Sequence, residues 1–305
     1  MTTRRQFTRT VLAGLTLPAL SARWSQGSPV GGVRLGVQTY SFREVARAGT
    51  AGAVDTILTA MKTCGLDECE LWAPQIEAVA MVPRDAAPPA QQQAREALRT
   101  WRLKTGTDFY NGVRRRFSAA GMTIYAYNLS FNESFTDDEI TRGFEAARAL
   151  GAEVITASTT LRMAKRLVPF AETHRIPVAM HNHSNVTDPN EFATPQSLTT
   201  TLAMSPFFRV NLDIGHFTAA DFDALAFLEA HHDTITNLHL KDRKKHQGDN
   251  VPWGQGDTPI RETLAWLKRR GSPVRAYVEY EYAGTRGAVA EVTACAEYAR
   301  KALTT

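Results

Sequence analysis

Short apolar runs alternate with amphipathic segments from about residue 33 to the end of the chain. Each run is five to eight residues long, which is typical of strands that are buried on both faces of a parallel sheet. The eight predicted strands are residues 33–40, 68–72, 122–128, 153–158, 176–181, 208–213, 234–240 and 274–280.

The segments between these runs have helical periodicity and recognisable ends. Residues 54–61 place apolar side chains at positions i, i+3, i+4 and i+7, and Gly65 stands where a helix would stop. Thr136 and Glu139 have the spacing of a capping box, and Gly151 follows as the stop signal. These segments therefore predict helices that connect the strands.

A further helix is predicted to begin at Thr258 as N-cap, with Pro259 in its first turn, and to end at Gly271. Eight strand–helix units in about 270 residues are the number and size of a (β/α)8 TIM barrel. The alternative is a doubly wound open sheet, but no glycine-rich dinucleotide loop follows the first strand. The sequence predicts one α/β domain, a single barrel over residues 33–303.

One connection is much longer than the others. Residues 73–121 join the second and third strands, and from about Ala90 they predict one or two polar helices that run toward Gly121. In a barrel, an insertion that follows a strand starts at the active-site face, so we expect this segment to form a lid over the site.

The N-terminus has the pattern of an export signal. Arg4, Arg5 and Phe7 precede a short apolar segment at 11–20, and small residues follow it. The paired arginines resemble the twin-arginine type, which transports folded proteins; the alternative is a frayed helix. We expect residues 1–21 to be removed and the mature protein to be periplasmic or otherwise extracytoplasmic.

The net charge of the chain falls when this segment is removed. The whole sequence has a net charge of +4 and a pI near 9.0, but residues 1–21 hold three arginines and no acid, so the mature charge is +1. We therefore expect no nucleic-acid partner. No apolar run after the signal is long enough to span a membrane. The odd cysteine number predicts no disulfide framework: Cys64, Cys69 and Cys295.

Four residues with metal-binding side chains stand at the ends of the last four predicted strands. They are His181, Asp213, His239 and Glu279. Each one alone is more simply a hydrogen-bonding loop residue or a helix cap. In a barrel, however, successive strand ends point into one small volume. Two imidazoles and two carboxylates then predict one divalent metal ion, with Mn²⁺, Zn²⁺ or Co²⁺ as candidates.

Three residues near these ligands are candidates for a direct role in catalysis or substrate binding. The candidate bases for proton removal are Glu279 and either His183 or His181. His216 either contacts substrate hydroxyls or orients a ligand. Lys241 is expected to stabilise a developing enolate oxygen, with an ion pair to Asp242 as the alternative.

Three further residues are candidate substrate contacts. Glu70 and Trp72 share one face of the second strand, the face that would point into the barrel. Asn182 lies between the two histidines that end the fifth strand. These assignments complete the predicted site.

The motifs together resemble the sugar phosphate isomerase/epimerase family, the xylose-isomerase-like TIM barrels. The resemblance covers roughly residues 33–303 and is most specific at 212–216 (LDIGH), 239–243 (HLKDR) and 253–257 (WGQGD), followed by Glu279. It implies a barrel with one divalent metal held by residues of strands five to eight. The implied ligands are His181, Asp213, His239 and Glu279.

The sequence departs from the family's epimerases at one ligand. Those enzymes have Glu where this chain has His181, and they use it with the last-strand Glu as an acid–base pair on two faces of the sugar. The chain looks closer to members that eliminate water or an alcohol from keto-sugars. Isomerisation and elimination share the same residues, so both reactions stay open.

The expected substrate is a small carbohydrate. Sugar phosphates are cytoplasmic and the chain has no glycine-rich phosphate loop, so a neutral sugar or oxidised glycoside is expected. Two alternatives remain: a metal-dependent phosphodiesterase of the same superfamily, which would need a cluster of metals and more ligands than 8 histidines suggest, and a non-catalytic sugar-binding barrel.

Overall fold

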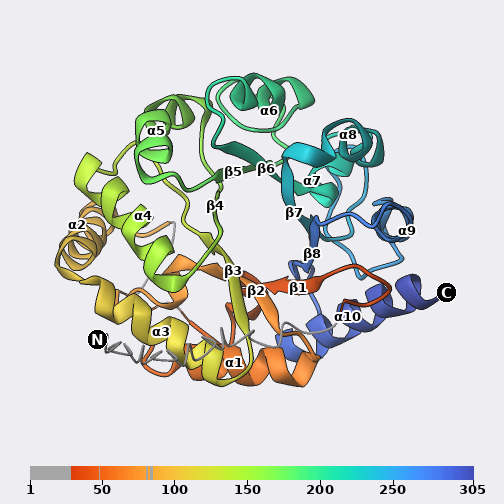
Figure 1. Ribbon diagram of the computed structural model, residues 1–305, viewed down its shortest axis with the longest axis horizontal. Helices are drawn as coiled ribbons and strands as arrows, with labels where there is room; N and C mark the ends of the chain where they lie inside the picture. Colours follow the sequence, from red (N-terminus) through yellow and green to blue (C-terminus); the bar gives the residue numbers. More distant parts are fainter. Residues whose placement is uncertain (1–28, 48, 80–81, 83–84) are drawn as a thin grey trace, which may run out of the picture.

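A computed structural model of the chain describes residues 29–47, 49–79, 82 and 85–305. The predicted signal segment, 1–21, lies outside these residues. Eight parallel strands close into a barrel in sequence order, β1 through β8, with β8 paired to β1. Viewed along the barrel, the helices surround the strands (Figure 1). The prediction of a (β/α)8 barrel is therefore confirmed.

All eight predicted strands are present, and most are shorter than predicted. The strands are β1 (Leu35–Gln38), β2 (Glu68–Trp72), β3 (Thr123–Asn128), β4 (Val154–Ala157), β5 (Val178–His181), β6 (Phe208–Asp213), β7 (Ile235–Leu240) and β8 (Arg275–Val278). As a result Glu279 directly follows β8, whereas His181, Asp213 and His239 are the last or penultimate residues of their strands.

Ten α-helices are present in the described residues. They are α1 (Ala53–Cys64), α2 (Pro88–Lys104), α3 (Thr107–Ala119), α4 (Asp137–Leu150), α5 (Leu161–His174), α6 (Pro195–Leu202), α7 (Ile214–Ala219), α8 (Ala224–His231), α9 (Ile260–Arg270) and α10 (Ala288–Thr304). Short 3₁₀ helices occupy Thr39–Phe42, Ala73–Gln75 and His232–Thr234.

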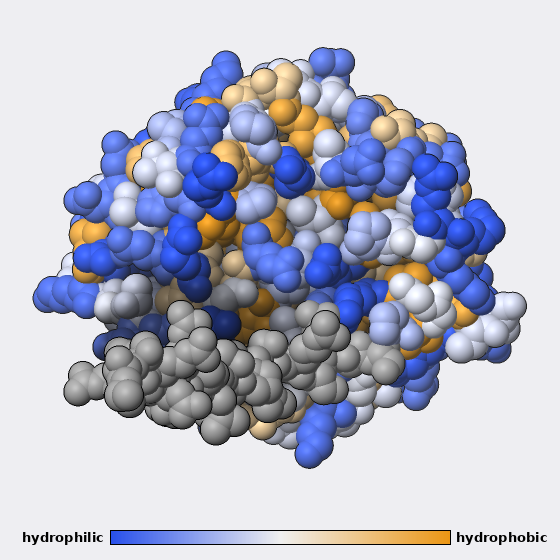
Figure 2. Space-filling model, viewed as in Figure 1, coloured by the Kyte–Doolittle hydropathy of each residue, from blue (hydrophilic) through white to orange (hydrophobic). Residues whose placement is uncertain are grey.

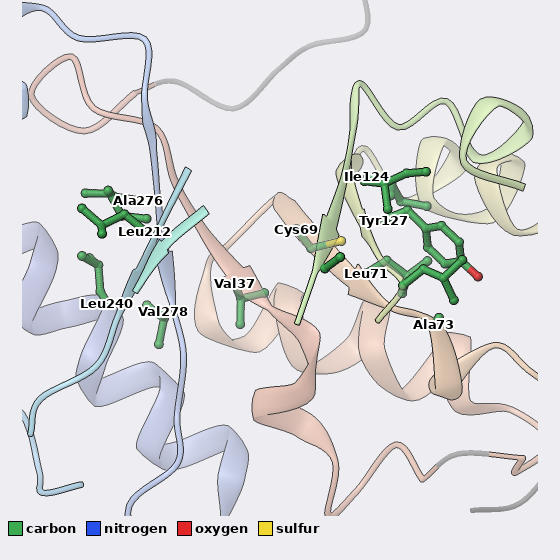
Figure 3. Packing of buried hydrophobic residues seen from close by; sticks show 14 of the residues in the cluster. Val37, Cys69, Leu71, Ala73, Ile124, Tyr127, Leu212, Leu240, Ala276 and Val278 are labelled. Atoms are coloured by element: carbon green, nitrogen blue, oxygen red, sulfur yellow. The ribbon is translucent and has the colours of Figure 1, made fainter. Parts of the chain in front are cut away.

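Residues alternate along each strand between the helix-facing side and the barrel interior. Apolar side chains such as Leu71, Leu212 and Val278 belong to the core between strands and helices, and they gather in groups beside the strands in Figure 3. The residues between them face inward and are polar near the C-terminal ends of the strands, as Asp213 and His239 are. This alternation sends the chemically active side chains into one volume.

The predicted helix ends agree with the structure in most cases. Thr136 and Glu139 form a complete capping box at the start of α4. The helix α9, however, begins one residue later than predicted, with Pro259 as its N-cap. The hydroxyl of Thr258 instead accepts a hydrogen bond from the backbone N–H of Arg243. Three predicted glycine stops adopt left-handed backbone angles: Gly65, Gly151 and Gly271.

The long insertion forms two helices, as predicted, but these lie along the side of the barrel. In Figure 1, α3 follows the outside of the barrel and α2 lies beyond α4. Arg95 and Arg99 of α2 bind the carboxylate of Glu139 on α4, and Arg102 binds Glu77. These ion pairs fix α2 against the outer layer of helices.

Among the described residues, no helix is both long and apolar enough to cross a membrane. The face in Figure 2 is mostly hydrophilic, with small scattered hydrophobic areas. Cys64, Cys69 and Cys295 are buried and form no disulfide, as the sequence predicts.

Candidate metal centre and its cavity

A cavity of about 360 Å³ opens at the C-terminal ends of the strands. Its size is that of a site for a small molecule. The lining residues are Gln38, Tyr40, Trp72, Asn128, Ser130, Ser158, His181, His183, His216, His239, Lys241, Glu279 and Glu281. No described residue of the 73–121 insertion is among them. The expectation of a lid is therefore wrong for the described part of that segment.

Three of the four predicted metal ligands, His181, His239 and Glu279, line this cavity, and Asp213 lies beside them. Each of the four has one buried atom without a hydrogen bond of regular geometry among the described residues: His181 Nδ1, Asp213 Oδ2, His239 Nδ1 and Glu279 Oε2. The Nδ1 atom of His239 lies 3.2 Å from Oε2 of Glu279 and 4.0 Å from Oδ2 of Asp213. Ligand atoms of His181, Asp213 and His239 all lie within 4.8 Å of one another.

These atoms fit a divalent metal ion. Zinc with ligands at about 2.1 Å in a tetrahedron spaces its ligand atoms about 3.4 Å apart. Buried polar atoms without a full set of partners cost free energy. His239 and Lys241 contact the two carboxylates, and a metal ion would satisfy the remaining capacity of the four atoms. The donor set of two imidazole nitrogens and two carboxylate oxygens suits the borderline metals Zn²⁺, Mn²⁺ and Co²⁺.

Asp213 is positioned through its other oxygen and its backbone. Its Oδ1 accepts a hydrogen bond of 2.7 Å from the backbone N–H of His216, which caps α7 and leaves Oδ2 for the cavity side. Asn182 binds the backbone of Asp213 on both sides: its amide donates to the carbonyl oxygen and its Oδ1 accepts from the N–H. Asn182 is fully buried and does not line the cavity. The prediction that it contacts substrate is corrected to a structural role.

Glu70 also differs from the prediction. Its carboxylate is fully buried beneath the cavity and does not line it. Oε2 lies 2.8 Å from Nε2 of His239, so it accepts the Nε2 hydrogen and leaves Nδ1 of the same ring for a metal. Glu70 therefore orients a ligand instead of touching substrate. Its other donors are Gln38, Asn128, Thr156, Asn211 and Asn237.

Lys241 reaches the ligands with its ammonium. Nζ lies 3.0 Å from Asp213 Oδ2 and 2.7 Å from Glu279 Oε2, and it also contacts Glu281. A Cβ atom on Gly215 would come within 2.3 Å of Cγ of Lys241, so glycine is required where the lysine side chain crosses α7. The lysine pairs with three carboxylates at the cavity and not with Asp242.

Asp242 has a separate role in the loop after β7. Its carboxylate accepts hydrogen bonds from the backbone N–H groups of Gly254, Gly256 and Thr258. A Cβ atom on Gly256 would lie 1.9 Å from Oδ1 of Asp242, which explains a glycine at this position. The 253–257 motif is therefore held against the 239–243 motif by one buried carboxylate.

Burial and charge pairing shift the pKa values of these groups, some upward and some downward. Burial, with His239 and His183 nearby, holds the pKa of His181 well below its usual range, so this ring is neutral. Burial raises the pKa of Asp213 to about 6, although Lys241 opposes it. Burial alone would lower the pKa values of His239 and Lys241, but the surrounding carboxylates outweigh it and raise both.

The pKa of Glu279 moves in the opposite direction. Burial would raise it, but His239 and Lys241 hold it well below its usual range. A carboxylate with such a low pKa is a poor proton acceptor and a good metal ligand. The contacts of Glu279 Oε2 with His239 and Lys241 also favour the ligand role of this residue over the base role.

Two further histidines stand above the ligands at the cavity wall. The Nδ1 atom of His183 lies 2.8 Å from Oε1 of Glu191, and Nδ1 of His216 lies 2.7 Å from Nη1 of Arg243. Burial, with Lys241 and His183 nearby, holds the pKa of His216 well below its usual range. With His181 they form a second cluster of ring nitrogens within 4.8 Å of one another.

The structure thus brings most of the predicted site residues together. His181, His183, His216, His239 and Glu279 line one cavity. The other lining residues from the prediction are Lys241 and Trp72, and the Trp72 ring lies edge-on to that of Tyr40, with centroids 4.8 Å apart.

Sequence reasoning missed several residues of the site. Glu281 has the same strand parity as Glu279, and this spacing was a usable signal. Gln38 is the last residue of β1, and Tyr40 lies two residues further on, in the 3₁₀ helix. Both line the cavity, although no sequence motif marks them. Glu191 and Arg243 come from loops, and no local pattern links them to the histidines that they bind.

Comparison with known proteins identifies the family to which these features point. The sequence profile of the xylose isomerase-like TIM barrel family matches residues 58–301. No protein of curated function matches the chain in sequence.

Several solved structures share the fold at low sequence identity. A sugar phosphate isomerase/epimerase from Parabacteroides distasonis is 17% identical, with a TM-score of 0.61 over 90% of this chain and 97% of that one. A 3-keto-D-glucoside 4-epimerase from E. coli is 11% identical, with a TM-score of 0.60 over 88% and 99%. The IOLI protein with a bound zinc atom is 14% identical, with a TM-score of 0.61 over 89% and 98%.

Proposed function

Because the chain belongs to the xylose isomerase-like TIM barrel family, we propose that it is a metal-dependent enzyme that eliminates a leaving group from a non-phosphorylated keto-sugar. One observation carries the proposal. Four candidate ligand atoms, two of them also in contact with Lys241, converge beside a cavity whose wall holds His183, a histidine whose Nε2 is available for proton transfer.

The ligand set supports a metal ion as cofactor. His181, Asp213, His239 and Glu279 would hold it, and a solved relative of the fold carries zinc. When bound, a divalent ion supplies Lewis acidity that polarises a sugar carbonyl and makes the neighbouring C–H acidic. Lys241 keeps the two carboxylates ionised and oriented, through contacts of 3.0 and 2.7 Å.

Proton removal is assigned to His183. Its side chain is 39% exposed and it lines the cavity, whereas Glu279 is held by Lys241. In a 3-keto-glycoside, the base takes the proton from C2, and the C–H electrons form an enolate with the C3 carbonyl. The enolate then forms a C1–C2 double bond as the C1–O bond breaks. The aglycone oxygen takes up the proton that His183 removed from C2, so His183 is neutral again and the products are an alcohol and an unsaturated keto-sugar.

The cavity supports a neutral substrate. Lys241 is the only lysine or arginine among the described lining residues, and its ammonium is already paired with three carboxylates. A phosphate group would find no unpaired lysine or arginine there. The Tyr40–Trp72 pair offers an apolar surface of the kind that suits a sugar ring.

A 3-keto-glycoside incubated with the metal-loaded protein in D2O tests this proposal by NMR. We expect release of the aglycone and an unsaturated or hydrated keto-sugar. His183→Gln should lower turnover by about 10² or more, as expected for loss of a general base, and keep its metal. Glu279→Gln should lose metal and turnover together. His232→Gln, on the outside of the barrel, serves as control and should change neither.

Clean interconversion of two epimers with deuterium incorporation and no aglycone would replace elimination by epimerisation. Binding without any turnover would favour a sugar-binding barrel instead.

A second candidate function has one observation in its favour. The cluster of His181, His183 and His216 suggests a second metal position, as a metal-dependent phosphodiesterase of this superfamily would need. Two or more metal ions per chain, with cleavage of a phosphodiester, would support it.

A further inference from the structure

Among the residues that the structure describes, His183 is hydrogen-bonded through one side of its ring only. Its Nδ1 lies 2.8 Å from Oε1 of Glu191. An ionised carboxylate can only accept hydrogen bonds, so the hydrogen of the neutral ring lies on Nδ1. The Nε2 atom then keeps its lone pair. The backbone of Glu191 is held by an isolated antiparallel β-bridge to Thr160.

His216 has the opposite arrangement. Its Nδ1 lies 2.7 Å from Nη1 of Arg243. A guanidinium is always protonated and can only donate, so Nδ1 accepts. The hydrogen of the neutral ring must then lie on Nε2.

Arg243 is rigidly placed for this task. It is 9% exposed. Its Nε and Nη2 both donate to the carbonyl oxygen of Gly248, at 3.1 and 2.7 Å, and Nη1 also donates to the hydroxyl of Ser184 at 3.0 Å. The guanidinium therefore joins the loops after β5 and β7 and cannot easily turn away from His216.

The two rings are neighbours at the wall of one cavity. Their centroids lie 5.1 Å apart, with the rings edge to face, and both line the cavity. We propose that Glu191 and Arg243 are positioning residues that fix opposite tautomers on His183 and His216, so that the pair presents one proton acceptor and one N–H donor to the same substrate.

This pair deepens the proposed function and rests on it for the chemistry. The acceptor Nε2 of His183 takes the proton from the carbon next to the carbonyl. The N–H of His216 donates a hydrogen bond to an oxygen of the substrate that gains negative charge in the same step. No proton has to leave His216, so the donor is ready before the substrate arrives.

The same tautomers argue against a second metal ion at the cluster of His181, His183 and His216. A ligating nitrogen must offer a lone pair. With Nδ1 of His216 occupied by a guanidinium hydrogen and Nε2 protonated, neither nitrogen of this ring has one to offer. The positive charge of Arg243 beside the ring adds repulsion.

Nitrogen-15 NMR of histidine-labelled protein loaded with Zn²⁺, which is diamagnetic, tests the inference without substrate. Signals are assigned from His183→Gln and His216→Gln. We expect Nδ1–H on His183 and Nε2–H on His216. Arg243→Met should release the His216 tautomer, and Glu191→Ala that of His183; Arg209→Met, at the opposite end of β6, is the control. Nδ1–H on His216 in the wild type, or unchanged tautomers in both variants, would overturn the inference.

Kinetics supply a second readout. Arg243→Met and Glu191→Ala should each keep one metal per chain and lower turnover by about 10², at the lower end of acid–base effects. Arg243→Lys retains a charged donor and should recover part of the loss. If the tautomers are as expected but the keto-glycoside is not cleaved, the proposed reaction fails and the tautomer assignment stands.

Discussion

Glu70 illustrates how a single buried carboxylate can organise a site that it does not enter. Six side chains donate to its two oxygens, and one of them is His239, a candidate metal ligand. A carboxylate behind a ligating histidine fixes the ring and makes the other nitrogen a better ligand. The charge is compatible with full burial because every direction around it is occupied by a donor.

Glu70→Gln should weaken metal binding by about 10- to 100-fold, the usual cost of removing such a partner. The amide hydrogens of Gln would face donors, so the variant should also unfold more easily. Zinc affinity measured by competition with a chelator checks this prediction. Glu68→Gln is a matched control on the same strand, since Glu68 is buried and its carboxylate accepts a hydrogen bond from the Tyr277 hydroxyl and not from a candidate ligand. Equal affinity in Glu70→Gln and the wild type would contradict the role of Glu70.

Single residues also mark the limit of what the sequence could predict. The convergence of His181, Asp213, His239 and Glu279 was predictable because strand ends of a barrel converge, and their side chains are of the types that ligate metals. The role of Glu70 was not, because strand parity places it inside the barrel but does not tell whether it lies beneath the cavity or in its wall. Depth along the barrel axis depends on strand stagger, which no local pattern encodes.

At the scale of elements, α2 and α4 are joined by a charged cluster. Glu139 caps α4 and also binds the guanidinium groups of Arg95 and Arg99. Burial alone would raise the pKa of Glu139, but these arginines and the backbone of Thr136 lower it to about 2. The carboxylate therefore contributes stability in its ionised form.

This shift predicts a defined loss of stability in acid. The pKa is depressed in the folded state, so the contribution is complete above the ordinary value of 4.5 and disappears as the pH falls toward about 2. Glu139→Gln should lower the free energy of unfolding at pH 7 by about 3 kcal/mol, and the difference from wild type should shrink through this window. Urea unfolding at several pH values measures it. Glu145→Gln, on the exposed side of α4, should have little effect, and a pH-independent difference for Glu139→Gln would contradict the account.

Elements were predictable where the signal is local. Capping by Thr136 and Glu139 needs only four consecutive residues of sequence, and it was confirmed. Thr258 was predicted as a cap by the same logic, but its hydroxyl is used by the backbone of Arg243, a tertiary contact. The lid prediction failed for the described part of the insertion for a similar reason, because the arginines of α2 have partners on α4 that only the fold brings near.

At the scale of the whole molecule, the predicted export signal favours a non-phosphorylated substrate and implies folding before export. A twin-arginine route would carry the barrel already folded, and with its metal loaded. Replacing Arg4 and Arg5 together with Lys should leave precursor in the cytosol, whereas the wild type should yield a mature chain that starts near residue 22. Cell fractionation with N-terminal sequencing checks this. Normal export of the double variant would contradict the twin-arginine assignment.

The closed barrel explains why four segments that are distant in the sequence can form one candidate metal centre. The ends of β5, β6, β7 and β8 are neighbours in the sheet, so residues almost 100 positions apart in the chain supply adjacent ligand atoms. The proposed chemistry and the proposed roles of Glu70 and Lys241 all depend on this convergence.

Metal analysis of the purified mature protein tests this claim most directly. The account predicts about one divalent ion per chain in the wild type, and loss or strong weakening of binding in both Asp213→Ala and His239→Ala, because each variant removes a ligand and leaves its neighbours unsatisfied. Glu68→Gln should retain the ion. Full metal content in both ligand variants, or two or three ions per chain in the wild type, would contradict a single centre at these four strand ends.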